Sequence, residues 1–173
     1  MAFSTQELLE ATVQLCAAGR FLEARDRLAQ HLEADPEDLP ARLTLANLHG
    51  ILREDDAAAL CYRAALQIEP LSAEAHLLYG IHLLGRGEAG GAAEELSRSL
   101  FLDPDGAIAH YFLGRCREAQ RDPERARLAY RNAIDAHARR PAGRSQPFVG
   151  YYPDLPEDGA AFARAAEYAL RAL

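Results

Sequence analysis

The motif in this sequence that comes nearest to a ligand-binding signature is a set of glycines. Gly85, Gly87 and Gly90 match the pattern G-x-G-x-x-G, which binds a dinucleotide or S-adenosylmethionine where it follows a β-strand and opens a helix, because backbone N–H groups then face the ligand. No strand pattern precedes these glycines, and helical patterns flank them on both sides. We therefore interpret the motif as a turn between two helices and predict no cofactor.

The other side chains that could react or bind a metal lack the spacing that such chemistry needs. The histidines do not form H-E-x-x-H, and no serine or cysteine lies in a G-x-S-x-G elbow. Cys16, Cys61 and Cys116 are far apart in the chain, which disfavours both a disulfide framework and a zinc site. His76 and His110 hold equivalent places in the repeat described below, which indicates packing. We expect no catalytic residue and no metal site, and we do not predict an enzyme.

Composition and charge narrow the class of partner. The formal net charge is −7, whereas nucleic acids and anionic membranes select a concentrated basic surface. The N-terminal residues show no signal-peptide pattern, and no stretch approaches the roughly 20 apolar residues that span a membrane. The composition, 49% hydrophobic and only 8% aromatic with abundant alanine, favours closely packed helices. We expect an all-α cytoplasmic protein with no nucleic-acid partner and no membrane insertion.

The helices that must position any site follow a repeat of 34 residues. Pro36, Pro70 and Pro104 are spaced by this interval, each after an acidic residue. The period is that of a tetratricopeptide repeat (TPR), which is a helix–turn–helix unit. The predicted repeats are residues 5–38, 39–72, 73–106 and 107–140.

Small and large residues recur at fixed positions of these repeats. Position 8 is small and position 24 is large in every repeat, and position 20 is always alanine. The residues at positions 8 and 24 are Thr12, Ala46, Gly80 and Gly114, and Leu28, Tyr62, Leu96 and Tyr130. Because neither helix of a pair can bury its apolar stripe alone, neighbouring helices must share one core. The predicted fold is an all-α TPR solenoid of four helix–turn–helix repeats with a C-terminal capping helix.

Turn and cap signals fall at the same boundaries. Ser4 opens a capping-box pattern before the first helix, and Gly19 and Gly87 occupy the turn within the first and third repeats. Asp122 precedes a proline in the pattern of a helix start. Arg53 stands where glycine is usual, and this departure predicts a weaker second repeat.

The character of the sequence changes after Arg140. Residues 141–159 include four prolines and three aromatic residues, a composition that a continuous helix does not tolerate and that predicts a linker. Helical periodicity returns at residues 160–173, where one face is apolar and predicts a capping helix. That face consists of Phe162, Ala166, Ala169, Leu170 and Leu173.

The solenoid geometry predicts a partner-binding groove on the concave side, which the first helices of the repeats line. The candidate groove residues are Leu9, Val13, Leu43, Asn47, Leu77, Ile81, Ile108, Tyr111 and Arg115. A contiguous apolar surface of this kind is typical of an interaction site. We expect it to bind an amphipathic helix or an apolar peptide of another protein, with Asn47 and Arg115 hydrogen-bonding the ligand.

Two other occupants of the groove were weighed. The chain's own residues 148–155, or its capping helix, are an equally good prediction for what covers the groove. A clamp for a C-terminal carboxylate, as in chaperone-binding TPR proteins, is disfavoured because Asn47 is the only clamp-type residue and position 5 is never basic.

Residues 73–134 resemble a more specific family. The segments A-x-A-H at 73–76 and 107–110, L-D-P-D at 102–105 and Y-R-N-A at 130–133 resemble the C-terminal TPR module of CheR-type chemoreceptor methyltransferases, such as that of the Frz system of myxobacteria. In that family a catalytic domain using S-adenosylmethionine precedes the module.

The resemblance implies a regulatory module that controls receptor methylation. Its partners would be the methyltransferase catalytic domain, a chemoreceptor or another signalling protein. Since the sequence shows no such catalytic domain, we expect either a regulatory fragment or a free-standing relative. The alternative is an unrelated bacterial TPR adaptor or scaffold in secretion or envelope assembly.

Overall fold

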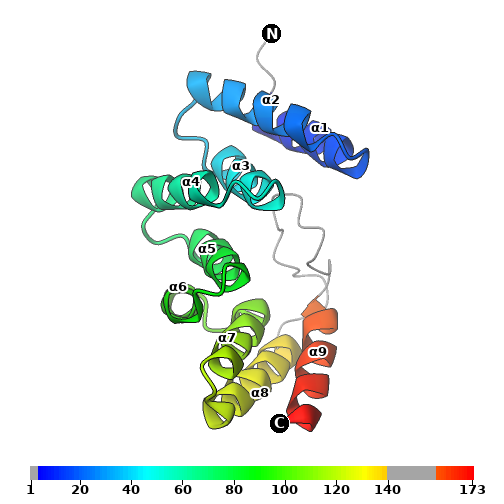
Figure 1. Cartoon of the computed structure of the whole chain (residues 1–173), viewed down its shortest axis with the longest axis vertical. Coiled ribbons are helices and arrows are strands. Elements are labelled where there is room, and N and C mark those ends of the chain that lie inside the picture. The colour runs from blue at the N-terminus through cyan, green and yellow to red at the C-terminus, as the bar shows by residue number, and fades with distance from the viewer. Residues whose placement is uncertain (1–3, 140–158) are drawn as a thin grey trace. The chain divides into compact units, whose positions relative to one another are not determined.

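The computed structural model describes residues 4–139 and 159–173, and within these ranges every regular element is an α-helix (Figure 1). The helices are α1 (Thr5–Ala17), α2 (Phe21–Ala34), α3 (Leu39–Ile51), α4 (Asp55–Ile68), α5 (Ala73–Gly85), α6 (Ala89–Leu102), α7 (Ala107–Ala119), α8 (Pro123–Arg139) and α9 (Gly159–Ala172). The predicted all-α fold class is therefore confirmed. The predicted linker lies outside the described residues except for Gly159.

The first helices of successive pairs begin at equal intervals. α1, α3, α5 and α7 start at Thr5, Leu39, Ala73 and Ala107, which are 34 residues apart. Each packs against the helix that follows it, and the pairs group into two compact units, one with α1–α4 and the other with α5–α9. None of the helices in the described ranges combines the length and the apolar character needed to cross a membrane.

Polar side chains cap the N-termini of α1, α3 and α5, whereas α7 begins after Gly106 without a side-chain cap. Ser4 caps α1 in a capping box with Glu7, as the sequence predicted. Asp38 Oδ1 accepts the N–H of Ala41 at 3.0 Å at the start of α3, and Ser72 caps α5 in the same way. These side chains satisfy backbone N–H groups that have no partner within the helix.

The turn inside each pair uses a left-handed residue at the same place. Gly19 and Gly87 have φ of 74° and 82°, and Arg53 and Arg121 have φ of 62° and 59°. These four residues occupy equivalent positions 34 residues apart, so the turn keeps one conformation even where glycine is absent. The G-x-G-x-x-G motif thus lies where α5 ends and α6 begins, as predicted.

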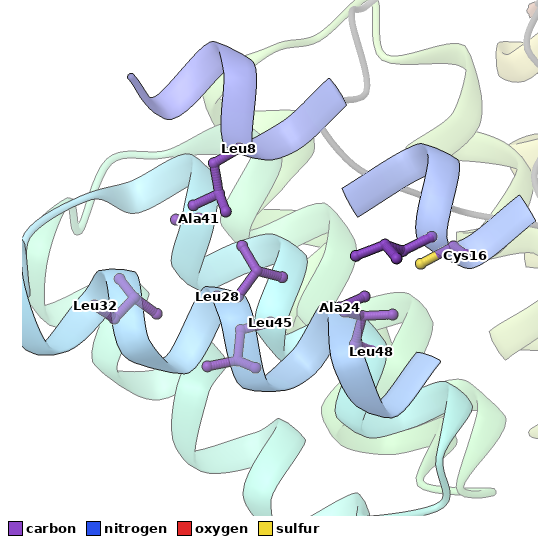
Figure 2. Packing of buried hydrophobic residues seen from close by; sticks show 9 residues of the cluster. Leu8, Cys16, Ala24, Leu28, Leu32, Ala41, Leu45 and Leu48 are labelled. Carbon is purple, nitrogen blue, oxygen red and sulfur yellow. The ribbon is translucent and has the colours of Figure 1, made fainter. Parts of the chain in front are cut away.

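Leucines and small residues from α1, α2 and α3 form a core in the first unit (Figure 2). Leu28 of α2 and Leu48 of α3 are fully buried, together with Ala24 and Ala41. Full burial of one such leucine stabilises the fold by about 1.5–3 kcal/mol. The helix pair and the first helix of the next pair therefore share this core.

In the second unit, glycine lets the helices of a pair approach closely. A Cβ atom on Gly80 would lie 2.7 Å from Leu96 Cγ, and one on Gly114 would lie 2.5 Å from Tyr130 Cε1. Both distances are shorter than carbon atoms tolerate. The small residue predicted at position 8 therefore contacts the large residue at position 24 of the same repeat.

Helix α9 takes the place that a first helix would have in one more repeat. It packs against α8 and also against α7 (Figure 1), just as α7 packs against α6 and α5. Its other side is exposed and mostly polar, with Arg164, Glu167, Tyr168 and Arg171. A polar outer face is typical of the helix that ends a stack of repeats, and α9 lies where the sequence predicted a capping helix.

Candidate interaction surface

In the first unit, the candidate groove residues differ in exposure. Leu43 of α3 is buried, with 2% of its surface exposed, whereas Val13 of α1 is 42% exposed. Leu9 is half-buried and packs against the core of α1, α2 and α3. Asn47 is half-buried and has an interaction partner. Val13 is therefore the most accessible of these side chains.

In the second unit, the candidates divide in a similar way. Leu77 of α5 and Ile108 of α7 are buried, with exposures of 2% and 6%. Ile81 and Tyr111 are half-buried, and Arg115 is exposed. The helices α5 and α7 contact each other directly, so Ile81 and Arg115 lie on neighbouring first helices.

One position of the repeat stays accessible throughout, and another does not. Position 9 is half-buried or exposed in every repeat, whereas position 5 is buried in the second and third. The residues at position 9 are Val13, Asn47, Ile81 and Arg115. A partner that binds the folded chain can therefore reach position 9 without displacing core leucines.

Tyr111 lies in a cluster of aromatic rings on α7, α8 and α9. Its ring centroid is 5.3 Å from that of Phe112, 5.8 Å from that of Tyr130 and 5.5 Å from that of Phe162. Edge and tilted arrangements at these distances are favourable beyond the apolar area that they bury. Phe162 of α9 therefore covers a residue that the sequence assigned to the groove.

Charged groups border this cluster. Tyr130 donates its hydroxyl hydrogen to Glu118 Oε2, and Arg115 Nε lies 3.9 Å from the same carboxylate oxygen. Burial and the bond to Glu118 raise the pKa of Tyr130 well above its usual value. The hydrogen bond to the Tyr111 side chain raises the pKa of Arg115, so this guanidinium stays charged. About half of the Arg115 side chain is exposed.

Histidines at position 4 of the third and fourth repeats serve the packing. His76 Nδ1 lies 2.7 Å from Glu95 Oε2, and both side chains are buried between α5 and α6. His110 Nε2 lies 3.0 Å from the carbonyl oxygen of Pro104. Burial lowers the pKa of His110 below its usual value, so it is neutral at pH 7 and can donate this hydrogen bond from Nε2.

A group of three side chains in the first unit has the composition of a metal site. Ligand atoms of His31, Asp35 and Asp38 lie within 4.8 Å of one another. However, Asp38 Oδ2 already accepts the hydroxyl of Thr5 at 2.5 Å and lies 2.7 Å from His31 Nε2. These bonds join α1, α2 and the start of α3, which gives the group a structural role.

The three cysteines are thiols without a disulfide partner. Cys16 and Cys116 are buried and Cys61 is half-buried. Burial raises the pKa of Cys116 to about 11 and also raises that of Cys16. A thiol with a raised pKa carries little of the reactive thiolate at pH 7.

The capping helix was one of the segments predicted to cover the candidate surface, but the contact of Phe162 with Tyr111 and the bond network of Asp38 were not predicted. The sequence contained a signal for each. Phe162 begins the apolar face of the capping helix, and Asp38 and Ser72 share position 34 of their repeats. The sequence predicted that this apolar face covers the last repeat but did not identify the residues of α7 and α8 that it contacts.

The sequence matches a known family over its central part. The family described as Tetratricopeptide repeat matches residues 43–107 and again residues 80–141, and the two matches together cover more than half of the chain. The chain belongs to the tetratricopeptide-repeat family. The helix pairs from α3 to α8, which these matches cover, are therefore TPR units, and the predicted TPR fold is confirmed.

Solved TPR structures share this fold at low sequence identity. A MamA structure is 20% identical, with 91% of this chain and 89% of that chain covered and a TM-score of 0.64. MamA from Desulfovibrio magneticus RS-1 is 18% identical over 78% of this chain and 76% of that chain, with a TM-score of 0.68.

A mutant of the Thermobaculum terrenum O-GlcNAc transferase is 25% identical over 78% of this chain, with a TM-score of 0.66. The match covers only 26% of that transferase chain. No curated protein matches the sequence.

Proposed function

We propose that this TPR chain is a non-catalytic, cytoplasmic interaction module that binds an amphipathic or apolar segment of a partner protein on its first helices. The observation that carries the proposal is the accessibility of position 9, where Val13, Asn47, Ile81 and Arg115 alternate between apolar and polar side chains. An apolar side chain beside a hydrogen-bonding one suits a helix that presents a mixed face.

The contacts differ between the two units. In the first unit, Val13 offers apolar surface and Asn47 an amide that can bond a polar group of the ligand. In the second unit, the half-buried Ile81 and Tyr111 offer apolar surface beside the charged Arg115. The exposed guanidinium favours a ligand with an acidic residue next to its apolar face. Leu43, Leu77 and Ile108 then support the surface from beneath.

We propose further that the partner belongs to a chemosensory methylation pathway. The support is the resemblance of residues 73–134 to the TPR module of CheR-type methyltransferases. In that case the chain controls receptor methylation by binding the catalytic domain, the receptor or another signalling protein. The alternative is a free-standing adaptor or scaffold in secretion or envelope assembly, a role with which the TPR fold is equally compatible.

Affinity capture tests the surface. We expect Ile81→Asp combined with Arg115→Glu to lose the partners that the wild-type chain retains from a bacterial lysate. Leu128→Asp is the matched control, because Leu128 lies on α8 with 59% of its surface exposed and outside the proposed surface. Equal recovery of partners by all three proteins would contradict the proposal.

Calorimetry separates this function from an enzymatic one. The isolated chain is expected to show no heat of binding with S-adenosylmethionine. Saturable binding at micromolar ligand would instead indicate a cofactor site and overturn the non-catalytic assignment.

A further inference from the structure

The capping helix covers part of the surface that the proposed function assigns to a partner. Phe162 of α9 is buried, and its ring centroid lies 5.5 Å from that of Tyr111 and 5.9 Å from that of Phe112. Ala166, Ala169, Leu170 and Leu173 of the same helix pack against Tyr130 and its neighbours. The whole predicted apolar face of α9 is therefore engaged in this contact.

We call the surface of α7 and α8 that contacts α9 the seat. The residues of α9 that face this seat indicate which helix sequences it can bind. An aromatic ring enters at Phe162, and alanine is required one turn later because Ala166 has no exposed surface. Leu170 follows one turn after that and packs against the same cluster. The seat therefore accepts an amphipathic helix with an aromatic residue, a small residue and a leucine spaced by four.

A bond at the far end fixes the direction of the helix. Arg127 of α8 donates to the main-chain oxygen of Leu173, so the C-terminal end of α9 lies beside this guanidinium. Carbonyl groups at a helix C-terminus carry partial negative charge and favour a cation. A helix that reproduces the apolar face in the opposite direction would not place its C-terminus at Arg127.

We propose that α9 is an internal ligand, and that a helix of a partner protein with the same face replaces it on α7 and α8. This inference rests on the proposed function, since it assumes that a protein segment is the ligand of the first helices. It adds the sequence pattern of the partner and a mode of regulation. The chain binds its partner weakly while α9 is seated and strongly once α9 is displaced.

The connection between α8 and α9 sets the strength of this competition. Nineteen residues, 140–158, join the two helices in the sequence. A ligand that belongs to the same chain as its binding surface competes at an effective concentration on the order of millimolar. A partner helix with the affinity of α9 itself must therefore reach millimolar concentration, or bind more tightly, to replace it.

A peptide with the sequence of residues 159–173 provides the probe. Labelled with fluorescein at its N-terminus, it is titrated with the full chain and followed by fluorescence anisotropy. The Phe162→Asp chain, in which α9 loses its aromatic anchor, is expected to bind the peptide at least tenfold more tightly than the wild-type chain. Tyr168→Asp is the matched control, because this α9 residue is 77% exposed, and it should bind as the wild-type chain does.

A double variant tests whether the peptide binds at the seat. Phe162→Asp combined with Tyr111→Asp removes the ring that α9 contacts and is expected to return peptide binding to the wild-type level or below. Equal affinity of the peptide for the wild-type, Phe162→Asp and Tyr168→Asp chains would overturn the proposal. Failure of Ile81→Asp with Arg115→Glu to reduce partner capture would instead count against the proposed function.

Hydrogen exchange of the wild-type chain gives a readout that does not depend on a variant. With millimolar unlabelled peptide, amides of α9 are expected to exchange faster while those of α7 and α8 keep their protection. Unchanged protection of α9 at that concentration would overturn the proposal. Wild-type dimers detected by light scattering would also overturn the proposal if they form by exchange of α9, since the seat would then bind a second copy of this chain.

Discussion

At the scale of single residues, the contact between Gly114 and Tyr130 explains a column of the repeat. The ring of Tyr130 lies where the Cβ of any larger residue at 114 would be. The sequence predicted that position 8 must be small for the helices of a pair to approach, because this rule is local to one helix pair, but it did not identify Tyr130 as the partner of Gly114. It could not predict the exposure of Leu43 or Leu77, since burial at position 5 depends on what packs over the first helix.

Gly114→Ala is expected to lower the free energy of unfolding by about 1–3 kcal/mol, the usual cost of overpacking. The added methyl group would lie within 3 Å of several ring atoms of Tyr130, and the buried ring has little room to move. Gly90→Ala in α6 is the control, because nothing lies within 4 Å of its added Cβ. Urea denaturation followed by circular dichroism measures both; an equal midpoint for the two variants would contradict the contact.

Asp38 should make stability depend on pH in the acid range. Burial alone raises the pKa of this carboxyl, but hydrogen bonds from Thr5, Ala41 and His31 outweigh it and hold the pKa below its usual value. A lowered pKa in the folded state stabilises the fold above the unfolded value of about 3.9, and this contribution is lost as the pH falls through the folded value.

Asp38→Asn keeps a capping side chain but removes the charge. It is expected to cost about 1.5–3 kcal/mol at pH 7, the range for a hydrogen bond to a charged group, and the difference from the wild-type chain should shrink below about pH 4. Urea midpoints measured from pH 2.5 to 7 test this. A difference that stays constant over the whole range would show that ionisation of Asp38 does not contribute.

At the scale of helices, the turn within each pair keeps its conformation across all described repeats. Arg53 was predicted to weaken the second repeat because glycine is usual there, and the structure shows that Arg53 and Arg121 both adopt the left-handed conformation. Helix positions and turns could be predicted because they depend on period and caps within a few residues. The individual contacts of α9 with α7 and α8, such as that of Phe162 with Tyr111, could not, since they involve residues far apart in the chain.

Replacing the arginine in this turn by glycine should stabilise the fold. A non-glycine residue in the left-handed region costs roughly 1–2 kcal/mol, and the greater freedom of glycine in the unfolded chain offsets part of the gain. We therefore expect Arg53→Gly to raise the free energy of unfolding by up to about 1 kcal/mol. Gly87→Ala should lower it by a similar amount, and thermal melts of both variants would reveal the opposite signs.

At the scale of the whole molecule, the chain contains two compact units, and each unit has a buried cysteine in the first helix of one of its helix pairs. Cys16 lies in α1 and Cys116 in α7. Both thiols are buried, and the raised pKa values keep them unreactive in the folded chain. Each cysteine therefore reports the unfolding of its own unit.

Thiol labelling in increasing urea, read by mass spectrometry, separates the two units. Gly114→Ala is expected to shift the labelling midpoint of Cys116 to lower urea by more than that of Cys16, because the substitution lies in the unit of α5–α9. Stability in repeat proteins is a sum of local and nearest-neighbour contributions. Equal shifts at both cysteines would show that the chain unfolds as one cooperative block.

The polar outer side of α9 has a consequence for how such an array can lengthen by duplication. An additional copy of α7 and α8 inserted ahead of α9 would present the same aromatic residues to α9, so α9 would still pack on it. A copy added after residue 173 would meet arginine and glutamate side chains instead. A copy inserted ahead of α9 is therefore expected to fold, whereas a copy added after residue 173 is not expected to pack on α9. Circular dichroism of the two longer chains would show this as a larger helical content for the chain with the insertion.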